Sequence, residues 1–220
     1  MNTETAIRVA VLGDSGVGKS ALVQRLMGQT PDTRPSPYFE MNCMMEGDTV
    51  IEFLEVVDAS MFEVLLTGVH VILIVFDSGS PAVRTKRFLN ETVQRLLSFA
   101  EHGSLCARPD FTPSRSAPRN SSGVDLPPIL LVANKCDTSS AERIPLSLPI
   151  HCEVAYVSAK EGSGDWSLIR SFLSNAAALA VSKTASAAAQ RRVQAEDVRA
   201  SYAASAFAFG SGSFGRRDPS

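Results

Sequence analysis

The chain has 220 residues and is 45% hydrophobic, which is enough to bury one substantial core but not two equal ones. Its 21 basic and 23 acidic residues give a formal net charge of −2, so no basic field indicates a nucleic-acid partner. No segment approaches the ~20 consecutive apolar residues of a membrane span, and the polar start lacks the apolar core of a signal peptide. We expect a cytoplasmic protein.

The cysteines and histidines indicate no metal or catalytic site. The four cysteines are widely spaced and form no C-x-x-C pair of the kind that metal and redox sites use. They are Cys43, Cys106, Cys136 and Cys152, and we expect all four to be reduced thiols. We expect His70 and His151 to serve packing or the surface.

The first part of the chain predicts two strands and one helix. The apolar run 7–12 ends directly in Gly-Asp-Ser-Gly, as a buried strand does when it feeds a loop, and a helix is expected over 20–27. Residues 28–37 include three prolines and predict a surface loop, and residues 50–57 predict the second strand. Three methionines before that strand fit either a soft partner surface or, as the favoured alternative, an edge strand with one face on the core: Met41, Met44 and Met45.

The later part of the chain alternates strands with helices. Residues 69–76 and 129–133 are almost wholly apolar, as expected of parallel strands covered on both faces. Between them, apolar residues at helical spacing predict a crossover helix: Leu89, Val93, Leu96, Leu97 and Ala100. A strand over 154–157 precedes an amphipathic helix over about 165–181. This alternation predicts a three-layer α/β sandwich with a mostly parallel central sheet and ligand loops at the carboxyl ends of the strands.

Two segments fall outside this pattern. Residues 102–128 are rich in Pro, Ser and Arg and too long for an ordinary connection, so we expect a disordered insertion there. From residue 183 to residue 220 the chain is Ala-rich and then Gly/Ser-rich, with six basic residues against three acidic ones. We expect this tail to be partly helical and partly disordered.

The first motif joins the first predicted strand to the first predicted helix. Gly13-Asp14-Ser15-Gly16-Val17-Gly18-Lys19-Ser20 matches G-x-x-x-x-G-K-[ST] at every fixed position. Its glycines allow backbone N–H groups to point at phosphate oxygens, and the helix amino terminus adds partial positive charge. Lys19 is expected to neutralise the β and γ phosphates, and the Ser20 hydroxyl to ligate Mg²⁺.

Two further motifs follow later strands. Asn134-Lys135-Cys136-Asp137 comes directly after the strand over 129–133, about 115 residues beyond Lys19, and Ser158-Ala159-Lys160 follows the strand over 154–157. The three motifs, in this order, resemble those of the Ras-like small GTPases. This resemblance implies that Asp137 faces the base, where a carboxylate favours guanine over adenine, because adenine does not offer the matching pair of N–H donors.

The resemblance covers residues 6–182 and implies a P-loop NTPase fold, a Ras-like G domain, that binds GTP or GDP with Mg²⁺. It implies that Asp137 accepts two guanine N–H donors, that Lys135 packs its stem over the base, and that a backbone N–H of the 158–160 loop meets guanine O6. Ser20 is the expected metal ligand, and no catalytic residue is identified. The expected nucleotide-binding residues are Gly13, Asp14, Ser15, Gly16, Val17, Gly18, Lys19, Ser20, Ala21, Asn134, Lys135, Asp137, Ser158, Ala159 and Lys160.

The family's Thr that senses the γ-phosphate has no match. The family places this Thr about 20 residues after the loop Lys, where its hydroxyl completes the Mg²⁺ shell. No Thr occurs between Arg34 and Asp48. The possible substitutes, none of them correctly spaced, are Thr30, Thr33 and Ser36.

The D-x-x-G motif of the family is also altered. In one register Glu55 replaces the Asp and Asp58 the Gly, and in the other Asp58 is the Asp and Met61 replaces the Gly. A β-carbon at the glycine position obstructs the approach of an N–H to the γ-phosphate, and no Gln occurs between Gln29 and Gln94 to orient water. We therefore expect GTP hydrolysis to be slow or absent and the γ-phosphate switch to be weak.

A narrower resemblance suggests partners. The segments V-L-G-D-S-G-V-G-K-S and I-E-F-L-E-V-V-D, the polar insertion and the Phe-Gly-Arg-Arg-Asp ending resemble the Rab-like branch, and within it the Rab-like protein 3 group. The last cysteine is Cys152, so we expect no direct lipid anchor. Protein effectors or regulators are the partners that this resemblance implies.

Three hypotheses are weighed against these observations. The first is a Rab-like small GTP-binding protein that acts in trafficking or ciliary regulation through partner binding, a process inferred by analogy alone. The alternative is a pseudo-GTPase, an interaction module without a nucleotide switch. The third, a P-loop kinase for nucleotides or small metabolites, is opposed by the second and third motifs.

Overall fold

The computed structural model describes residues 5–31, 41–47, 49–56, 66–101, 126–138 and 148–182. Contacts divide the chain into two units, Met1–Ala180 and Val181–Ser220. The strands and helices below build the first unit, except that the last helix continues to residue 182. None of the helices in these ranges is both long enough and apolar enough to cross a membrane.

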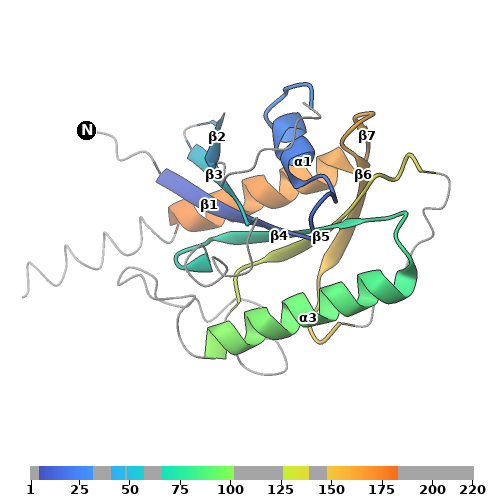
Figure 1. Ribbon diagram of the computed structural model, residues 1–220. Coiled ribbons are helices and arrows are strands. Elements are labelled where there is room, and N and C mark those ends of the chain that lie inside the picture. Colours follow the sequence, from blue (N-terminus) through green and yellow to red (C-terminus); the bar gives the residue numbers. More distant parts are fainter. Residues whose placement is uncertain are drawn as a thin grey trace, which may run out of the picture. The chain divides into compact units, whose positions relative to one another are not determined.

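In the part of the chain that the structure describes, seven strands form one mixed, mostly parallel sheet (Figure 1). Across the sheet the strands follow the order β2-β3-β1-β4-β5-β6-β7. The inner strands pair in parallel, whereas β2 pairs antiparallel with β3 and β7 pairs antiparallel with β6. In chain order the strands are β1 (Thr5–Leu12), β2 (Met41–Glu46), β3 (Thr49–Glu55), β4 (Val71–Asp77), β5 (Ile129–Asn134), β6 (Glu153–Ser158) and β7 (Ser163–Gly164).

The strand order places a switch point beside β1. β1 lies between β3 and β4, so the chain goes to one side of β1 for β3 and to the other side for β4. The parallel strands end at one edge, where the register sets Asp77 of β4 opposite Asn134 of β5. In open α/β sheets, ligands bind in the crevice at the carboxyl ends of the strands beside such a point. This edge is therefore where a binding site is expected.

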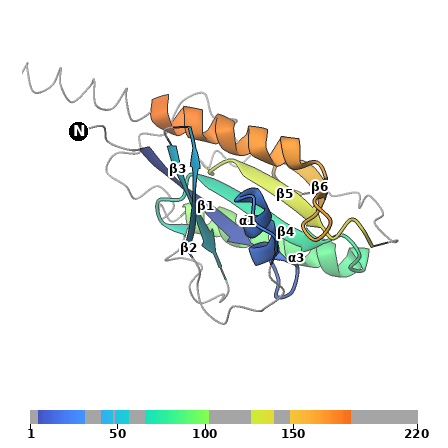
Figure 2. The ribbon, with the colours of Figure 1, turned by 90° about the horizontal axis from the view of Figure 1, so that it is seen from above.

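Helices cover both faces of the sheet. α1 (Lys19–Leu26) and a helix over residues 166–182 pack on one face, which Figure 2 views from above, and α3 (Ala82–Glu101) packs on the other (Figure 1). Alternate residues of each inner strand enter the two cores: Val11 joins Leu22 of α1, and Ala10 joins Leu89 of α3. All four side chains are fully buried. Burial on both faces explains why these strands read as nearly continuous apolar runs.

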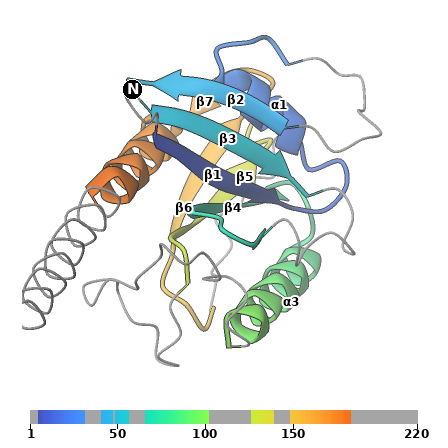
Figure 3. The same cartoon turned by 90° about the vertical axis from the view of Figure 1, so that its left-hand side faces the viewer.

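The outer strands differ in how far the sequence predicted them. β2 lies at the edge of the sheet (Figure 3). It confirms the edge strand expected for the methionines, because Met44 packs against the core while Met45 is 57% exposed. β7 was not predicted. Its pairing depends on Gly164, where a Cβ would collide with the backbone of Tyr156 and Val157.

Several expectations fall wholly or partly outside the described residues. These include the loop from 32 to 37, Asp58 and Met61 of the altered motif, residues 102–125 of the expected insertion, and the tail from residue 183. The last residues of the expected insertion are described. Leu126 packs against the core, and the carbonyl of Pro128 accepts a hydrogen bond from the Ile72 N–H at 3.0 Å.

Candidate functional site

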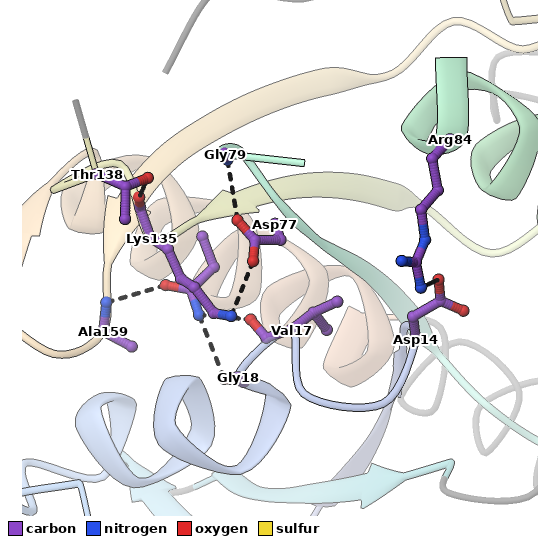
Figure 4. A network of polar contacts seen from close by, with 10 residues as sticks. Asp14, Val17, Gly18, Asp77, Gly79, Arg84, Lys135, Thr138 and Ala159 are labelled. Atoms are coloured by element: carbon purple, nitrogen blue, oxygen red, sulfur yellow. Dashed lines mark hydrogen bonds and ion pairs between the residues drawn. The ribbon is translucent and has the colours of Figure 1, made fainter. Parts of the chain in front are cut away.

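The three predicted motifs meet at the carboxyl edge of the sheet (Figure 4). Gly13 directly follows β1, Asn134 ends β5, and Ser158 ends β6. Because these strands are parallel, their ends lie at the same edge although the first motif is more than 100 residues from the other two in sequence. The fold thus brings together the residues that the sequence analysis grouped.

The glycine-rich loop wraps around the Lys19 ammonium. Lys19 Nζ donates to the carbonyl oxygens of Gly13 at 2.8 Å and Asp14 at 3.0 Å. Burial lowers the pKa of Lys19 below its ordinary value. The nearby carboxylates of Glu55 and Asp14 raise the pKa and so offset part of this shift. A cation held in a partly buried loop in this way is suited to an anionic ligand.

The amino terminus of α1 adds to this positive character. Gly18 precedes the helix with a φ of 93°, a conformation that favours glycine, and no side chain caps the first turn. The first N–H groups of a helix have no partner within the helix and carry partial positive charge. With Lys19 beside them, these groups have the chemistry of a phosphate site.

Asn134 joins the glycine-rich loop to the loop after β6. Its Nδ2 donates to the carbonyl oxygen of Val17 at 2.9 Å, and its Oδ1 accepts from the Ala159 N–H at 3.0 Å. The side chain is only 2% exposed, so both bonds are protected from water. A Cβ on Gly18 would collide with Asn134 Nδ2. The three motifs therefore form one connected structure.

Lys135 is held by a carboxylate that the sequence analysis did not select. Its Nζ donates to Asp77 Oδ2 at 2.8 Å, and Asp77 Oδ1 accepts from the Gly79 N–H at 2.9 Å (Figure 4). Lys135 has a φ of 63°, which is uncommon for a residue with a side chain. Such backbone conformations persist where the surroundings stabilise them and are frequent at binding sites.

Asp137 is exposed and held in its ionised form. A hydrogen bond from Ser158 is the main cause that lowers the pKa of Asp137, and the ammonium groups of Lys160 and Lys135 lower it further. Ser158 is fully buried, and its Oγ accepts from the Glu161 N–H at 3.1 Å. An ionised carboxylate is an acceptor only, so Asp137 suits a ligand that presents N–H donors.

Ser20, the predicted metal ligand, contacts Glu55 at the end of β3. Its hydroxyl donates to Glu55 Oε2 at 2.7 Å, and the Glu55 carboxylate is 2% exposed. In the described ranges, no three His, Cys, Asp or Glu residues gather as a metal site. A hydroxyl and a carboxylate suit Mg²⁺, which commonly takes its remaining ligands from water and substrate phosphates.

The remaining predicted residues line the same loops. Ser15 and Gly16 are exposed at the tip of the glycine-rich loop, Val17 is buried beneath it, and Ala21 is partly buried in the first turn of α1. Lys160 is exposed, and its Nζ lies 3.4 Å from Glu161 Oε1. Residues of the site that sequence reasoning missed are Arg25, Asp77 and Arg84, whose guanidinium lies 3.7 Å from Asp14 Oδ2.

Comparison with known proteins assigns no family to this site. No protein-family model matches the chain, and no curated protein matches it.

Proposed function

We infer that this protein binds a guanine nucleotide with Mg²⁺ at the carboxyl edge of its sheet. The observation that carries this proposal is the Asn134 side chain, which bonds to Val17 at 2.9 Å and to Ala159 at 3.0 Å. It connects a loop with the chemistry of a phosphate site to the loops around Asp137. One rigid arrangement can therefore hold both ends of a nucleotide.

Each part of the nucleotide has a counterpart in the site. Lys19 and the N–H groups at the start of α1 bind the phosphates, as in a P-loop NTPase of the Ras-like kind. Ser20 and Glu55, whose side chains meet at 2.7 Å, would hold Mg²⁺. Bound Mg²⁺ supplies neutralisation of phosphate charge. Asp137 accepts the N–H donors of guanine, and adenine lacks the matching pair.

A weak switch and weak hydrolysis belong to the same proposal. Glu55 stands in the place of the family's metal-binding Asp and carries one methylene more, and it already contacts Ser20 at 2.7 Å. Neither register of the altered motif retains the glycine that receives the γ-phosphate. We place the protein with the Rab-like proteins, regulating trafficking or ciliary processes through protein partners, and this last step rests on the motif resemblance alone.

Direct binding measurements test the proposal. Fluorescently labelled GDP and a non-hydrolysable GTP analogue are titrated with purified full chain, with and without Mg²⁺, and ADP serves as competitor. We expect both guanine nucleotides to bind, ADP to compete poorly, and Lys19→Ala and Asp137→Ala to abolish binding. Lys86→Ala, on the exposed surface of α3, is the matched control and is expected to bind normally. A wild-type chain that binds neither guanine nucleotide overturns the proposal.

The same titration distinguishes the second candidate, an interaction module without a nucleotide switch. The buried Glu55 beside Ser20 favours this candidate, because a longer carboxylate at the metal position alters the surroundings of the γ-phosphate. A ligand shifts a conformational equilibrium only through its differential affinity for the two states. Equal affinities for GDP and the GTP analogue therefore support the interaction module, and a clear difference supports a switch.

A further inference from the structure

Arg25, in the last turn of α1, contacts the loop that follows β6. Its Nε donates to the carbonyl oxygen of Ala159 at 3.0 Å, and its Nη2 donates to that of Lys160 at 2.8 Å. The helix that begins at the glycine-rich loop is thereby attached to a loop more than 130 residues away in sequence. Arg25 belongs to none of the sequence motifs.

The two carbonyl contacts set the direction of the N–H groups in this loop. None of the described peptide bonds is cis, and in a trans peptide the C=O and the following N–H point in opposite directions. Because Arg25 holds the carbonyls of Ala159 and Lys160, the N–H groups of Lys160 and Glu161 point away from Arg25. The Glu161 N–H follows this rule, since it donates to Ser158 Oγ at 3.1 Å.

The side of the loop opposite Arg25 is the side of Asp137. Ser158, which receives the Glu161 N–H, also forms the hydrogen bond that lowers the pKa of Asp137. The Ala159 N–H is used by Asn134 Oδ1 at 3.0 Å. Of the three successive N–H groups of Ala159, Lys160 and Glu161, that of Lys160 has no hydrogen-bond acceptor within the described ranges. It is therefore available to a carbonyl oxygen of a ligand that binds at Asp137.

We propose that Arg25 is a positioning residue for base recognition, which holds the Ala159–Lys160 peptide so that the Lys160 N–H faces the 6-oxo group of guanine. This inference rests on the proposed function and adds a specificity-determining residue to it. Arginine suits the role because its planar fork donates to two carbonyls at once, whereas a lysine ammonium is a single point charge. Loss of the fork leaves the peptide free to rotate, and the base loses one oriented donor.

The test compares two nucleotides that differ at the 6-oxo group. GDP and 6-thioguanosine 5′-diphosphate, whose base keeps both N–H donors for Asp137 and replaces the oxygen with the weaker acceptor sulfur, are titrated with the wild-type chain and with Arg25→Ala, Arg25→Lys and Arg170→Ala. Arg170 is the matched control, because its Nη2 lies 3.5 Å from the Leu26 carbonyl at the same end of α1. Among the described residues it forms no hydrogen bond to Ala159 or Lys160. We expect Arg25→Ala to weaken GDP binding by about tenfold, the size of a lost charged hydrogen bond.

The expected pattern is selective. Arg25→Ala weakens binding of the 6-thioguanosine nucleotide much less than binding of GDP, Arg25→Lys gives a smaller loss that again falls mainly on GDP, and Arg170→Ala changes neither affinity. Equal weakening of both nucleotides, or no weakening of either, overturns the role of Arg25 while the proposed function stands. A wild-type chain that does not bind GDP overturns both. Melting curves identify an unfolded alanine variant, in which case the GDP-selective loss in Arg25→Lys decides.

Discussion

At the scale of single residues, Gly18 and Asn134 depend on each other. Gly18 lies against Asn134 Nδ2 so closely that a β-carbon would overlap it, and Asn134 uses this amide to hold the Val17 carbonyl. Gly16 also has a positive φ, of 76°, but a β-carbon there would meet nothing within 4 Å. The two glycines therefore share a backbone conformation that would strain any other residue, and they differ in what a β-carbon would contact.

Alanine at these two glycines separates strain from contact. Gly16→Ala is expected to lower the free energy of unfolding by about 1–2 kcal/mol, the cost of a left-handed conformation for a residue with a side chain. Gly18→Ala is expected to cost about 1–3 kcal/mol more, because it displaces Asn134 and leaves buried polar groups without partners. Urea denaturation of the two variants measures this difference. Equal losses would contradict the proposed contact between Gly18 and Asn134.

The hydrogen bond between Ser158 and Asp137 should make the stability of the protein depend on pH. The hydrogen bond from Ser158 lowers the pKa of Asp137 in the folded protein, so its stabilising effect is present above the usual aspartate pKa and is lost as the pH falls through the lowered value. Ser158→Ala should raise the pKa of Asp137 towards that of a free aspartate. A carboxyl carbon NMR titration measures both proteins, and an unchanged pKa in the variant would exclude Ser158 as the main cause.

At the scale of the element, β2 shows how alternation divides one strand into two environments. Met44 lies opposite Ile51 on the face that packs against the core, and the next residue, Met45, lies opposite Val50 and is 57% exposed. Side chains of successive strand residues point to opposite faces of the sheet. At the edge of a sheet, an exposed charge is tolerated and opposes unwanted strand pairing.

Lysine substitutions at the two methionines test this division. Met45→Lys should change the free energy of unfolding by less than about 0.5 kcal/mol, as for most surface substitutions. Met44→Lys should cost about 2–5 kcal/mol, because it removes apolar packing and forces an ammonium towards the core. Thermal and urea unfolding of both variants provide the comparison. A larger loss for Met45→Lys would mean that the assigned register of β2 and β3 is wrong.

The sequence predicted those elements whose signal is local. Continuous apolar runs indicated β1, β4 and β5, and spaced apolar residues such as Leu89 and Val93 indicated α3. The two-residue β7 was not predicted, because its pairing depends on the close approach of Gly164 to the backbone of Tyr156. The motif residues of the site were also identified because each motif is a short, continuous stretch of sequence. Arg25 and Asp77 were not, because their roles arise from contacts with partners that are distant in sequence.

At the scale of the whole molecule, the two ends of the sheet carry different chemistry. The carboxyl edge gathers Lys19, Asn134 and Asp137, whereas the amino ends of β1 and β4 carry a separate group. In that group the Arg8 N–H donates to His70 Nδ1 at 3.0 Å, and the Arg8 guanidinium pairs with Glu52 at 3.0 Å. Arg8 and His70 belong to the same domain as the site but lie away from the strand ends that form it.

Hydrogen exchange can therefore map a ligand onto one end of the sheet. GDP at saturating concentration should slow exchange by local opening in three separate segments, residues 14–21, 134–138 and 158–162, because a bound ligand stabilises only the states that can hold it. Those amides near Glu52 and His70 that exchange by local opening should keep their rates, which provides an internal control. The Asp137→Ala variant should lose the protection in all three segments together, since the nucleotide no longer binds. Protection confined to the glycine-rich loop in the wild-type chain would instead mean that the protein binds phosphate without recognising the base.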